Sequence, residues 1–198
     1  MAEMISAVVL AAGGTPITGE PDWFLPLRGK PMLQWVLESA LASGLHEVIC
    51  VTRDLVAARQ QIALVHERLF WLANPAADRG RSTSVVAGLW AVDPKSLGAL
   101  FFAGNQPMVP RDLIDAIIRR FESSPALMVA PTFAGQARNP ALFRRDLFPE
   151  LLKLTGDRDG RALIEKYIDK TEFIEWNREA PFWDTELFKN GAQLNQLA

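Results

Sequence analysis

The sequence predicts an α/β protein of three layers (α/β/α), in which helices cover both faces of a doubly wound, mostly parallel β-sheet. Short apolar runs rich in β-branched residues alternate along the chain with longer segments of helical periodicity. Helix-sized segments between successive strands form right-handed crossovers, which produce parallel sheets. The length of 198 residues suits a single domain.

Composition and charge narrow the class of function. With 49% hydrophobic and 22% charged residues, the composition is that of an ordinary globular protein. The formal net charge is −2 and Lys and Arg form no block, so we expect no nucleic acid and no membrane surface as partner. Because the N-terminus lacks the pattern of a signal peptide or a membrane span, we expect a cytoplasmic protein that handles small molecules.

The first two elements have clear signals. Residues 4–10 form a short apolar run that ends in small residues and glycines, as expected of a buried parallel strand followed by a loop. Pro31 suits the first turn of a helix and Gly44 lies just past its end. Between them, one helical face carries the apolar side chains of Met32, Leu33, Val36, Leu37, Ala40 and Leu41.

The alternation continues to about residue 131. It predicts strands near 46–52, 68–73, 98–103 and 126–131, and helices near 55–63, 82–92 and 110–122. The single cysteine, Cys50, lies in one of these apolar runs, which predicts a buried and inert thiol.

The regularity weakens after residue 132. We expect a glycine-containing loop at 133–140, an amphipathic stretch at 146–154 and a turn at 155–160. A helix near 159–167, a strand near 171–176 and a closing helix within 184–198 complete an α+β extension of the same domain.

Three loops that follow predicted strands hold the unusual residues, and in a parallel sheet all three should meet at one edge, where ligands bind. The first contains Leu10, Ala11, Ala12, Gly13, Gly14 and Thr15. Its small side chains allow backbone N–H groups to approach a nucleotide closely. The loop matches neither GxGxxG nor GxxxxGK[ST], and a plain strand-to-helix turn explains it equally well.

The second and third loops carry polar side chains. Asn105 follows the apolar strand at 98–103 and suits a metal or phosphate partner, or a simple turn before Pro107. Gly80, Ser82 and Ser84 precede the helix near 82–92. The hydroxyl groups of these serines suit capping of that helix or contact with a base or ribose.

Together these segments resemble the MobA-like nucleotidyltransferases, most closely the molybdenum cofactor cytidylyltransferase-like proteins. LAAGGTPITGEPD followed by WFLPLRGKPML is similar to the family pattern LAAGxSxRMGxxK followed by LLPLxGxPLL, without a gap. NPAADRGRSTSVVAGL resembles NPxxxxGxSxSLxxGL, AGNQPMVPRDLI resembles GDQPLVxPELI, and FWDTELF resembles DIDTPEDY. ARNPALFRRDLFPELLKLTGDRDGRALI resembles the segment from GHPVLF to GDxGAR, so the matches cover nearly the whole chain in order.

The resemblance implies a nucleotide-diphospho-sugar-transferase-like, Rossmann-like fold that binds a nucleoside triphosphate, CTP or GTP, with Mg²⁺. It implies that the phosphate of an acceptor, a pterin phosphate in molybdenum cofactor biosynthesis, attacks the α-phosphate while pyrophosphate leaves. It further implies a molybdoenzyme or maturation protein as partner. In its terms, residues 1–132 form a nucleotide-binding half and residues 133–198 an acceptor-side extension of one domain.

Three charged positions of the family motifs are replaced in this chain. Ile17 stands where the family has a phosphate-binding Arg, Asp22 where it has Lys, and Asn105 where it has a metal-binding Asp. Asp184 is the one metal carboxylate that carries over, and an Asn ligates Mg²⁺ without balancing its charge. Loss of one preorganised charge costs about 2.7–4 kcal/mol in the transition state, so we expect reduced or lost catalysis.

Other charged and aromatic residues have two interpretations each. Arg79 and Arg81 flank Gly80 and could replace the missing cations opposite a triphosphate, or lie in a solvated loop. Trp23 and Phe24 place aromatic bulk near the cleft, where they either fill the pocket or pack the loop.

Four further side chains are expected at the surface. They are the cations of Arg28 and Lys30, which could alternatively swing in to replace the missing charges, and the imidazoles of His46 and His66, two side chains expected without a partner.

Three functions remain open from the sequence. The chain is a nucleotidyltransferase of the molybdenum cofactor type that works with substituted residues, or a non-catalytic nucleotide- or pterin-binding protein, a pseudoenzyme with a regulatory role. A sugar-phosphate nucleotidyltransferase shares the first loop but fits the GNQP and GDRDGR segments less well.

Overall fold

The computed structural model describes residues 4–13 and 21–185. Its strands are β1 (Ile5–Ala11), β2 (Pro26–Leu27), β3 (Lys30–Pro31), β4 (Glu47–Thr52), β5 (Leu69–Ala73), β6 (Gly98–Ala103), β7 (Met128–Phe133), β8 (Gln136–Ala137), β9 (Ala141–Arg144) and β10 (Thr171–Glu175). Its α-helices are α1 (Met32–Leu41), α2 (Leu55–Gln61), α3 (Ser82–Ala91), α4 (Arg111–Glu122), α5 (Phe148–Leu151) and α6 (Arg161–Lys166).

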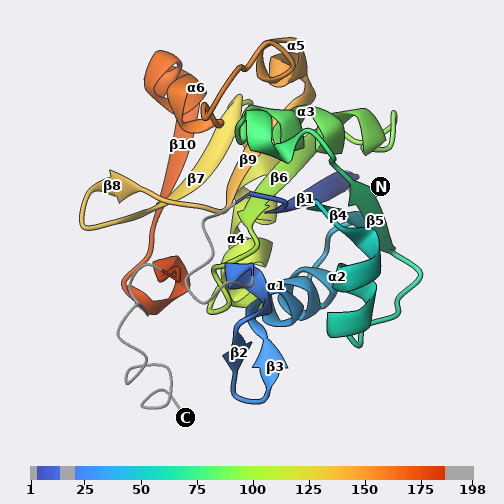
Figure 1. Ribbon diagram of the computed structural model, residues 1–198. Helices are drawn as coiled ribbons and strands as arrows, with labels where there is room; N and C mark the ends of the chain where they lie inside the picture. The colour runs from blue at the N-terminus through green and yellow to red at the C-terminus, as the bar shows by residue number, and fades with distance from the viewer. Residues whose placement is uncertain (1–3, 14–20, 186–198) are drawn as a thin grey trace.

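One mostly parallel sheet passes through the described chain, in the order β10-β7-β9-β6-β1-β4-β5, with β8 paired to β7 (Figure 1). β1 lies at its centre and pairs in parallel with both β4 and β6. β2 and β3 form a separate small antiparallel hairpin. The predicted α/β fold with a mostly parallel sheet is therefore confirmed.

Two hydrophobic cores lie on opposite faces of this sheet. Alternate residues of β1 explain the arrangement, because Ala7 and Val9 belong to one core and Val8 belongs to the other. The first core is covered by α1 and α4, and the second by α3, α5 and α6, which Figure 1 shows on opposite sides of the strands. A strand buried on both faces needs a continuous apolar run, as the sequence of β1 has.

The second half of the chain adds two strands that the sequence did not predict. β9 lies antiparallel between β6 and β7, and β8 lies inside the segment expected to be a loop. With four residues, β9 is too short for its pattern to be distinguished from a loop. Through β7, β9 and β10 the later segments extend the same sheet.

Candidate functional site

A cavity of about 940 Å³ opens at the carboxyl ends of the parallel strands. Gly13 follows β1, Gly80 follows β5 and Asn105 follows β6, and all three line this cavity. The backbone N–H of Gly104 donates to the carbonyl oxygen of Leu10 at 3.0 Å, which holds the loop after β6 beside the end of β1. The expectation that these loops meet at one edge is confirmed.

The residues predicted for the site occupy three different environments. Those that line the cavity are Leu10, Gly13, Asp22, Gly80, Ser84, Asn105 and Asp184. Ala11, Ala12 and Ser82 are buried and do not line it. Gly14, Thr15 and Ile17 lie outside the described residues, as does most of the predicted closing helix.

Three of the cavity residues are joined by hydrogen bonds although they are far apart in sequence. Asn105 Nδ2 donates to Thr185 Oγ1 at 3.1 Å, and Thr185 Oγ1 donates to Asp22 Oδ2, also at 3.1 Å. Asp22 and Asn105 stand at two of the three positions where the family resemblance implies a different charged residue. Both belong to one hydrogen-bonded unit, whose central residue, Thr185, carries no signal in the sequence.

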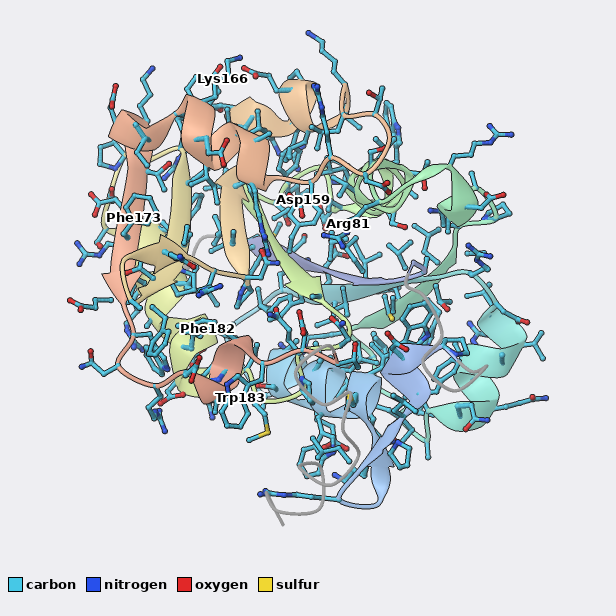
Figure 2. All side chains as sticks on the ribbon, turned by 60° about the vertical axis from the view of Figure 1, so that its left-hand side comes forward. Arg81, Asp159, Lys166, Phe173, Phe182 and Trp183 are labelled. Carbon is cyan, nitrogen blue, oxygen red and sulfur yellow. The ribbon has the colours of Figure 1, made fainter. Side chains whose placement is uncertain are left out.

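The segment before Thr185 is attached to the loop after β6 by a second hydrogen bond. Gln106, which follows Asn105, donates from Nε2 to the carbonyl oxygen of Phe182 at 3.2 Å. Figure 2 shows Phe182 and Trp183 together on this segment. Gln106 Oε1 is buried and has no hydrogen-bond partner among the described residues.

The hydroxyl groups of Thr83 and Ser84 are held by a buried asparagine. Asn74 Nδ2 donates to Thr83 Oγ1 and to Ser84 Oγ, at 2.9 Å each, and α3 begins without a side-chain cap. The capping expected of Ser82 or Ser84 is wrong, because both serines lie inside α3 and its N-cap position is Arg81. Contact of the Ser84 hydroxyl with a base or ribose stays a prediction, since Ser84 lines the cavity. Asn74 directly follows β5, and a polar residue directly after a predicted strand is the sequence signal that could have identified it.

The charges on the described wall of the cavity are mostly negative. It carries two arginines, Arg81 and Arg161, and no lysine. Its five carboxyl groups belong to Asp22, Asp78, Asp157, Asp159 and Asp184. Arg79 is exposed and does not line the cavity, whereas Arg81 does and pairs with Asp159 at 3.0 Å.

The donor set suits a metal ion only together with a ligand. Among residues 4–13 and 21–185, no group of three His, Cys, Asp or Glu side chains is arranged to hold a metal. Asp22 and Asp184 offer carboxylates and Asn105 offers an amide oxygen on the cavity wall. Mg²⁺ commonly uses one or two carboxylates plus waters and phosphates of a bound substrate, so these residues fit that mode.

The two aromatic residues near the first loop differ in their surroundings, because Trp23 lines the cavity and Phe24 does not. Trp23 is buried, lines the cavity and belongs to the first hydrophobic core, with Phe24 packed against that core. Their rings make an edge contact with centroids 6.3 Å apart.

The expected surface residues have more partners than predicted. Lys30 pairs with Glu38 at 2.8 Å, and Arg28 is exposed. His46 was expected without a partner, but its Nε2 lies 3.3 Å from Asp93 Oδ2. His66 Nδ1 likewise accepts a hydrogen bond from a backbone N–H.

The thiol of Cys50 and the lengths of the helices bear on two further expectations. Cys50 is fully buried, as predicted, and burial raises the pKa of its thiol well above the ordinary value, which is the condition for the inert thiol expected from the sequence. No helix within the described part of the chain is long and apolar enough to cross a membrane.

Helices on both faces of a mostly parallel sheet, with a cavity at the strand ends, define the doubly wound α/β class of proteins, and the solved structures given below match its nucleotide-diphospho-sugar-transferase-like form. Comparison with known proteins identifies the family. The sequence model of the MobA-like NTP transferase domain matches residues 7–171, and the chain belongs to this family.

The sequence identity between this chain and individual relatives is low. The chain is 28% identical over 165 residues to the purine catabolism protein PucB of Bacillus subtilis, covering 80% of this chain and 79% of PucB. It is 26% identical over 170 residues to the 3-deoxy-manno-octulosonate cytidylyltransferase of Vibrio vulnificus, covering 84% of this chain but only 61% of that protein.

Among solved structures, Rv0371c of Mycobacterium tuberculosis superimposes with a TM-score of 0.78 and 24% identity over 90% of both chains. Rv0371c has also been crystallised in complex with manganese, in a form that superimposes with a TM-score of 0.73. These structural matches establish the fold.

Proposed function

We propose that the chain is a nucleotide-binding protein built on a nucleotidyltransferase scaffold, in which nucleotidyl transfer is reduced or lost. The observation that carries this proposal is the link from Asp22 through Thr185 to Asn105, with 3.1 Å at both steps. A lysine in place of Asp22 could not accept the hydrogen bond from Thr185. The local structure is therefore built around the substituted residues and not around the family's charges.

The charges on the cavity wall support the proposal that nucleotidyl transfer is reduced or lost. Transfer of a nucleotidyl group concentrates negative charge on phosphate oxygens, which enzymes stabilise with positioned cations and metal ions. Five aspartates and two arginines on the described wall have the opposite balance. Residues 14–20 of the sequence add one charged side chain, Glu20, which is also acidic.

The proposed site combines the predicted residues. The cavity residues Leu10, Gly13, Gly80 and Ser84 would hold the nucleoside, together with Gly14 and Thr15 of the first loop. Ala11, Ala12 and Ser82 would support these residues from the buried side. Asn105 and Asp184 would hold a Mg²⁺ ion together with a phosphate of the ligand, and the ion would supply positive charge at that phosphate. The chain's own Asp22 and Thr185 would orient the Asn105 amide through the hydrogen bonds described above.

The finer assignments follow from the resemblance and the relatives. The proposal includes CTP or GTP as the nucleotide and a pterin phosphate as the second ligand. It also includes a molybdoenzyme or maturation protein as partner and a cytoplasmic location. Residues 1–132 would bind the nucleotide and residues 133–198 the second ligand. The name of PucB adds purine catabolism as a related context, and that of the cytidylyltransferase adds a sugar-acid acceptor.

An active nucleotidyltransferase of the molybdenum cofactor type is the second candidate. Arg81 and Arg161 favour it, because they place two guanidinium groups on the cavity wall. In that case they would replace the charges missing at Ile17 and Asp22.

Binding and turnover measurements separate these candidates. We expect calorimetry to detect CTP or GTP binding to the wild-type chain, and a pyrophosphate assay with Mg²⁺ and a pterin phosphate to stay at background. Clear pyrophosphate release would overturn the loss of catalysis. Absence of nucleotide and pterin binding tighter than millimolar would overturn the binding role.

Restoring the family's charges provides a second test. Ile17→Arg, Asp22→Lys and Asn105→Asp combined should raise the affinity for nucleotide, because two added cations face its phosphates. The affinity for metal should rise in the presence of that nucleotide, because the phosphates and a carboxylate at position 105 hold the ion together. The exposed Glu165→Lys is a matched control, since it changes the net charge by the same amount away from the cavity. Equal affinities for the restored and control variants would contradict the proposed alignment of the site.

A further inference from the structure

Arg81 and Asp159 form an ion pair that connects two loops of the cavity wall. Arg81 Nη1 lies 3.0 Å from Asp159 Oδ2, and both residues line the cavity. Arg81 directly precedes α3 and Asp159 lies two residues before α6, so the pair joins the first part of the chain to the later part. Figure 2 shows the two labelled side chains next to each other between these helices.

The backbone beneath the pair fixes the distance between the two loops. The N–H of Ser82 donates to the carbonyl oxygen of Gly156 at 3.0 Å. Gly80 has a φ of +112°, and a Cβ added to it would lie 2.4 Å from the carbonyl carbon of Gly156. This close backbone contact holds the loop of Asp159 against the loop of Arg81.

Asp159 is itself held in place from the opposite side. Its Oδ1 accepts a hydrogen bond from the backbone N–H of Arg161 at 3.0 Å, while Oδ2 faces Arg81. The Asp159 side chain is 19% exposed and that of Arg81 is 57% exposed. The carboxylate is thus the anchored partner, and the guanidinium has the greater access to solvent.

This geometry determines what Arg81 offers to a ligand. A phosphate that approaches the guanidinium must share it with a fixed carboxylate, and like charges at such distances repel each other. Arg161 is the other arginine on the described wall, against five aspartates. Each added phosphate therefore meets a cation that is already partly neutralised.

We propose that Asp159 limits the phosphate charge that the cavity accepts, by occupying Arg81. This inference rests on the proposed function as a nucleotide-binding protein. It names the ligand class as nucleosides and nucleoside monophosphates in preference to triphosphates. Arg81 and Asp159 act as specificity-determining residues in this arrangement.

The test is a series of ligands that differ only in phosphate number. Calorimetry at low salt compares cytidine, CMP, CDP and CTP, and the corresponding guanosine series, on the wild-type chain and on Asp159→Asn. Asparagine keeps an oxygen for the N–H of Arg161 while removing the charge. In Asp159→Asn we expect the affinity for the triphosphate to rise about fivefold and the affinity for the nucleoside to stay unchanged. A change of about fivefold corresponds to the free energy of an exposed ion pair.

Two further variants isolate the pair. Asp157→Asn removes the same charge from the same loop and the same cavity wall, and should give less than half of the gain. Arg81→Gln combined with Asp159→Asn should abolish the gain, because the released cation is gone. The gain should also shrink at high salt.

The outcomes separate this inference from the proposed function. An Asp159→Asn chain that binds the whole series like the wild type would overturn the role of Asp159 and leave nucleotide binding intact. Equal gains from Asp157→Asn would show a general charge effect and would also overturn it. Failure of every nucleoside and nucleotide to bind any variant, with unchanged thermal unfolding, would overturn the proposed function itself.

Discussion

Thr185 Oγ1 donates a hydrogen bond to Asp22 Oδ2 at 3.1 Å across 163 positions of sequence. Thr185 is 1% exposed, so this bond lies out of contact with bulk water. It attaches the end of the described chain to the segment that follows the first loop. The bond therefore joins two residues of the cavity wall and fixes the carboxylate of Asp22, which stands where the family resemblance implies a lysine.

Replacing Thr185 with Val removes this hydroxyl at nearly constant volume. We expect a loss of about 1.5–3 kcal/mol in the free energy of unfolding, because a buried hydrogen bond to a charged group is removed. Urea unfolding followed by Trp fluorescence measures the change. Metal-dependent nucleotide binding should weaken as well, since the Asn105 amide loses its partner.

A second threonine provides the control for this variant. Thr171 Oγ1 donates to the carbonyl oxygen of Tyr167 at 2.9 Å in a half-buried place. Thr171→Val should cost about 1 kcal/mol, as expected for an ordinary neutral hydrogen bond. Equal losses for the two variants would show that the charge of Asp22 adds nothing.

Gly80→Ala should destabilise the contact between the two cavity loops. The added Cβ would lie 2.4 Å from backbone atoms of Gly156, and φ at Gly80 is +112°. We expect a loss of more than 2 kcal/mol, because steric overlap with backbone adds to conformational strain of about 1–3 kcal/mol. Thermal and urea unfolding measure this loss.

Gly135→Ala is the matched variant for this prediction. Gly135 has a φ of +73°, but a Cβ there would meet no atom within 4 Å. It should therefore cost only the strain, about 1–2 kcal/mol. If Gly135→Ala is as harmful as Gly80→Ala, the close approach of Gly156 does not limit substitution.

Metal binding should depend on the carboxylates beside Asn105. We expect Mn²⁺, measured by electron paramagnetic resonance in the presence of CTP or CMP, to bind more tightly to Asn105→Asp by about tenfold or more, because a carboxylate adds charge to the ligand set. Asp184→Asn should weaken binding by a similar factor. Asp146→Asn, which lies away from the cavity, should leave it unchanged.

The sequence predicted most of the sheet because its central strands have strong local signals. The apolar runs of β1, β4 and β6 and the helical faces of α1 and α4 depend on residues close to one another in sequence. β9 escaped prediction, because its four residues become a strand only through pairing with β6 and β7.

The site was predictable only in part, for a related reason. Strand-end loops meet at one edge in any parallel sheet, so Gly13, Gly80 and Asn105 could be placed together. The hydrogen bonds of Thr185 and the ion pair of Arg81 with Asp159 span 163 and 78 positions, respectively. Such contacts depend on the completed fold, and no local pattern encodes them.

The second face of the sheet carries a carboxylate whose contribution should depend on pH. Lys166 Nζ lies 2.6 Å from Glu150 Oε2, and the Tyr167 hydroxyl donates to Glu150 Oε1. The hydrogen bond from the Lys166 ammonium, followed by that from Tyr167, holds the pKa of Glu150 below its ordinary value. A carboxyl whose pKa is lower in the folded state stabilises that state above its unfolded pKa, near 4.3, and this stabilisation is lost as pH falls through the folded pKa.

Glu150→Gln should therefore lower Tm at pH 7, and the difference from the wild type should shrink as pH falls below about 4. Lys166→Gln should show the same convergence, and the double variant should lose less than the sum of the single variants, because both changes remove one interaction. Glu165→Gln, at an exposed position of α6 next to Lys166, removes the same charge as Glu150→Gln and should change Tm little. A constant difference between Glu150→Gln and the wild type from pH 7 to about pH 3 would mean that Glu150 stabilises the α5–α6 region through packing and not through its charge.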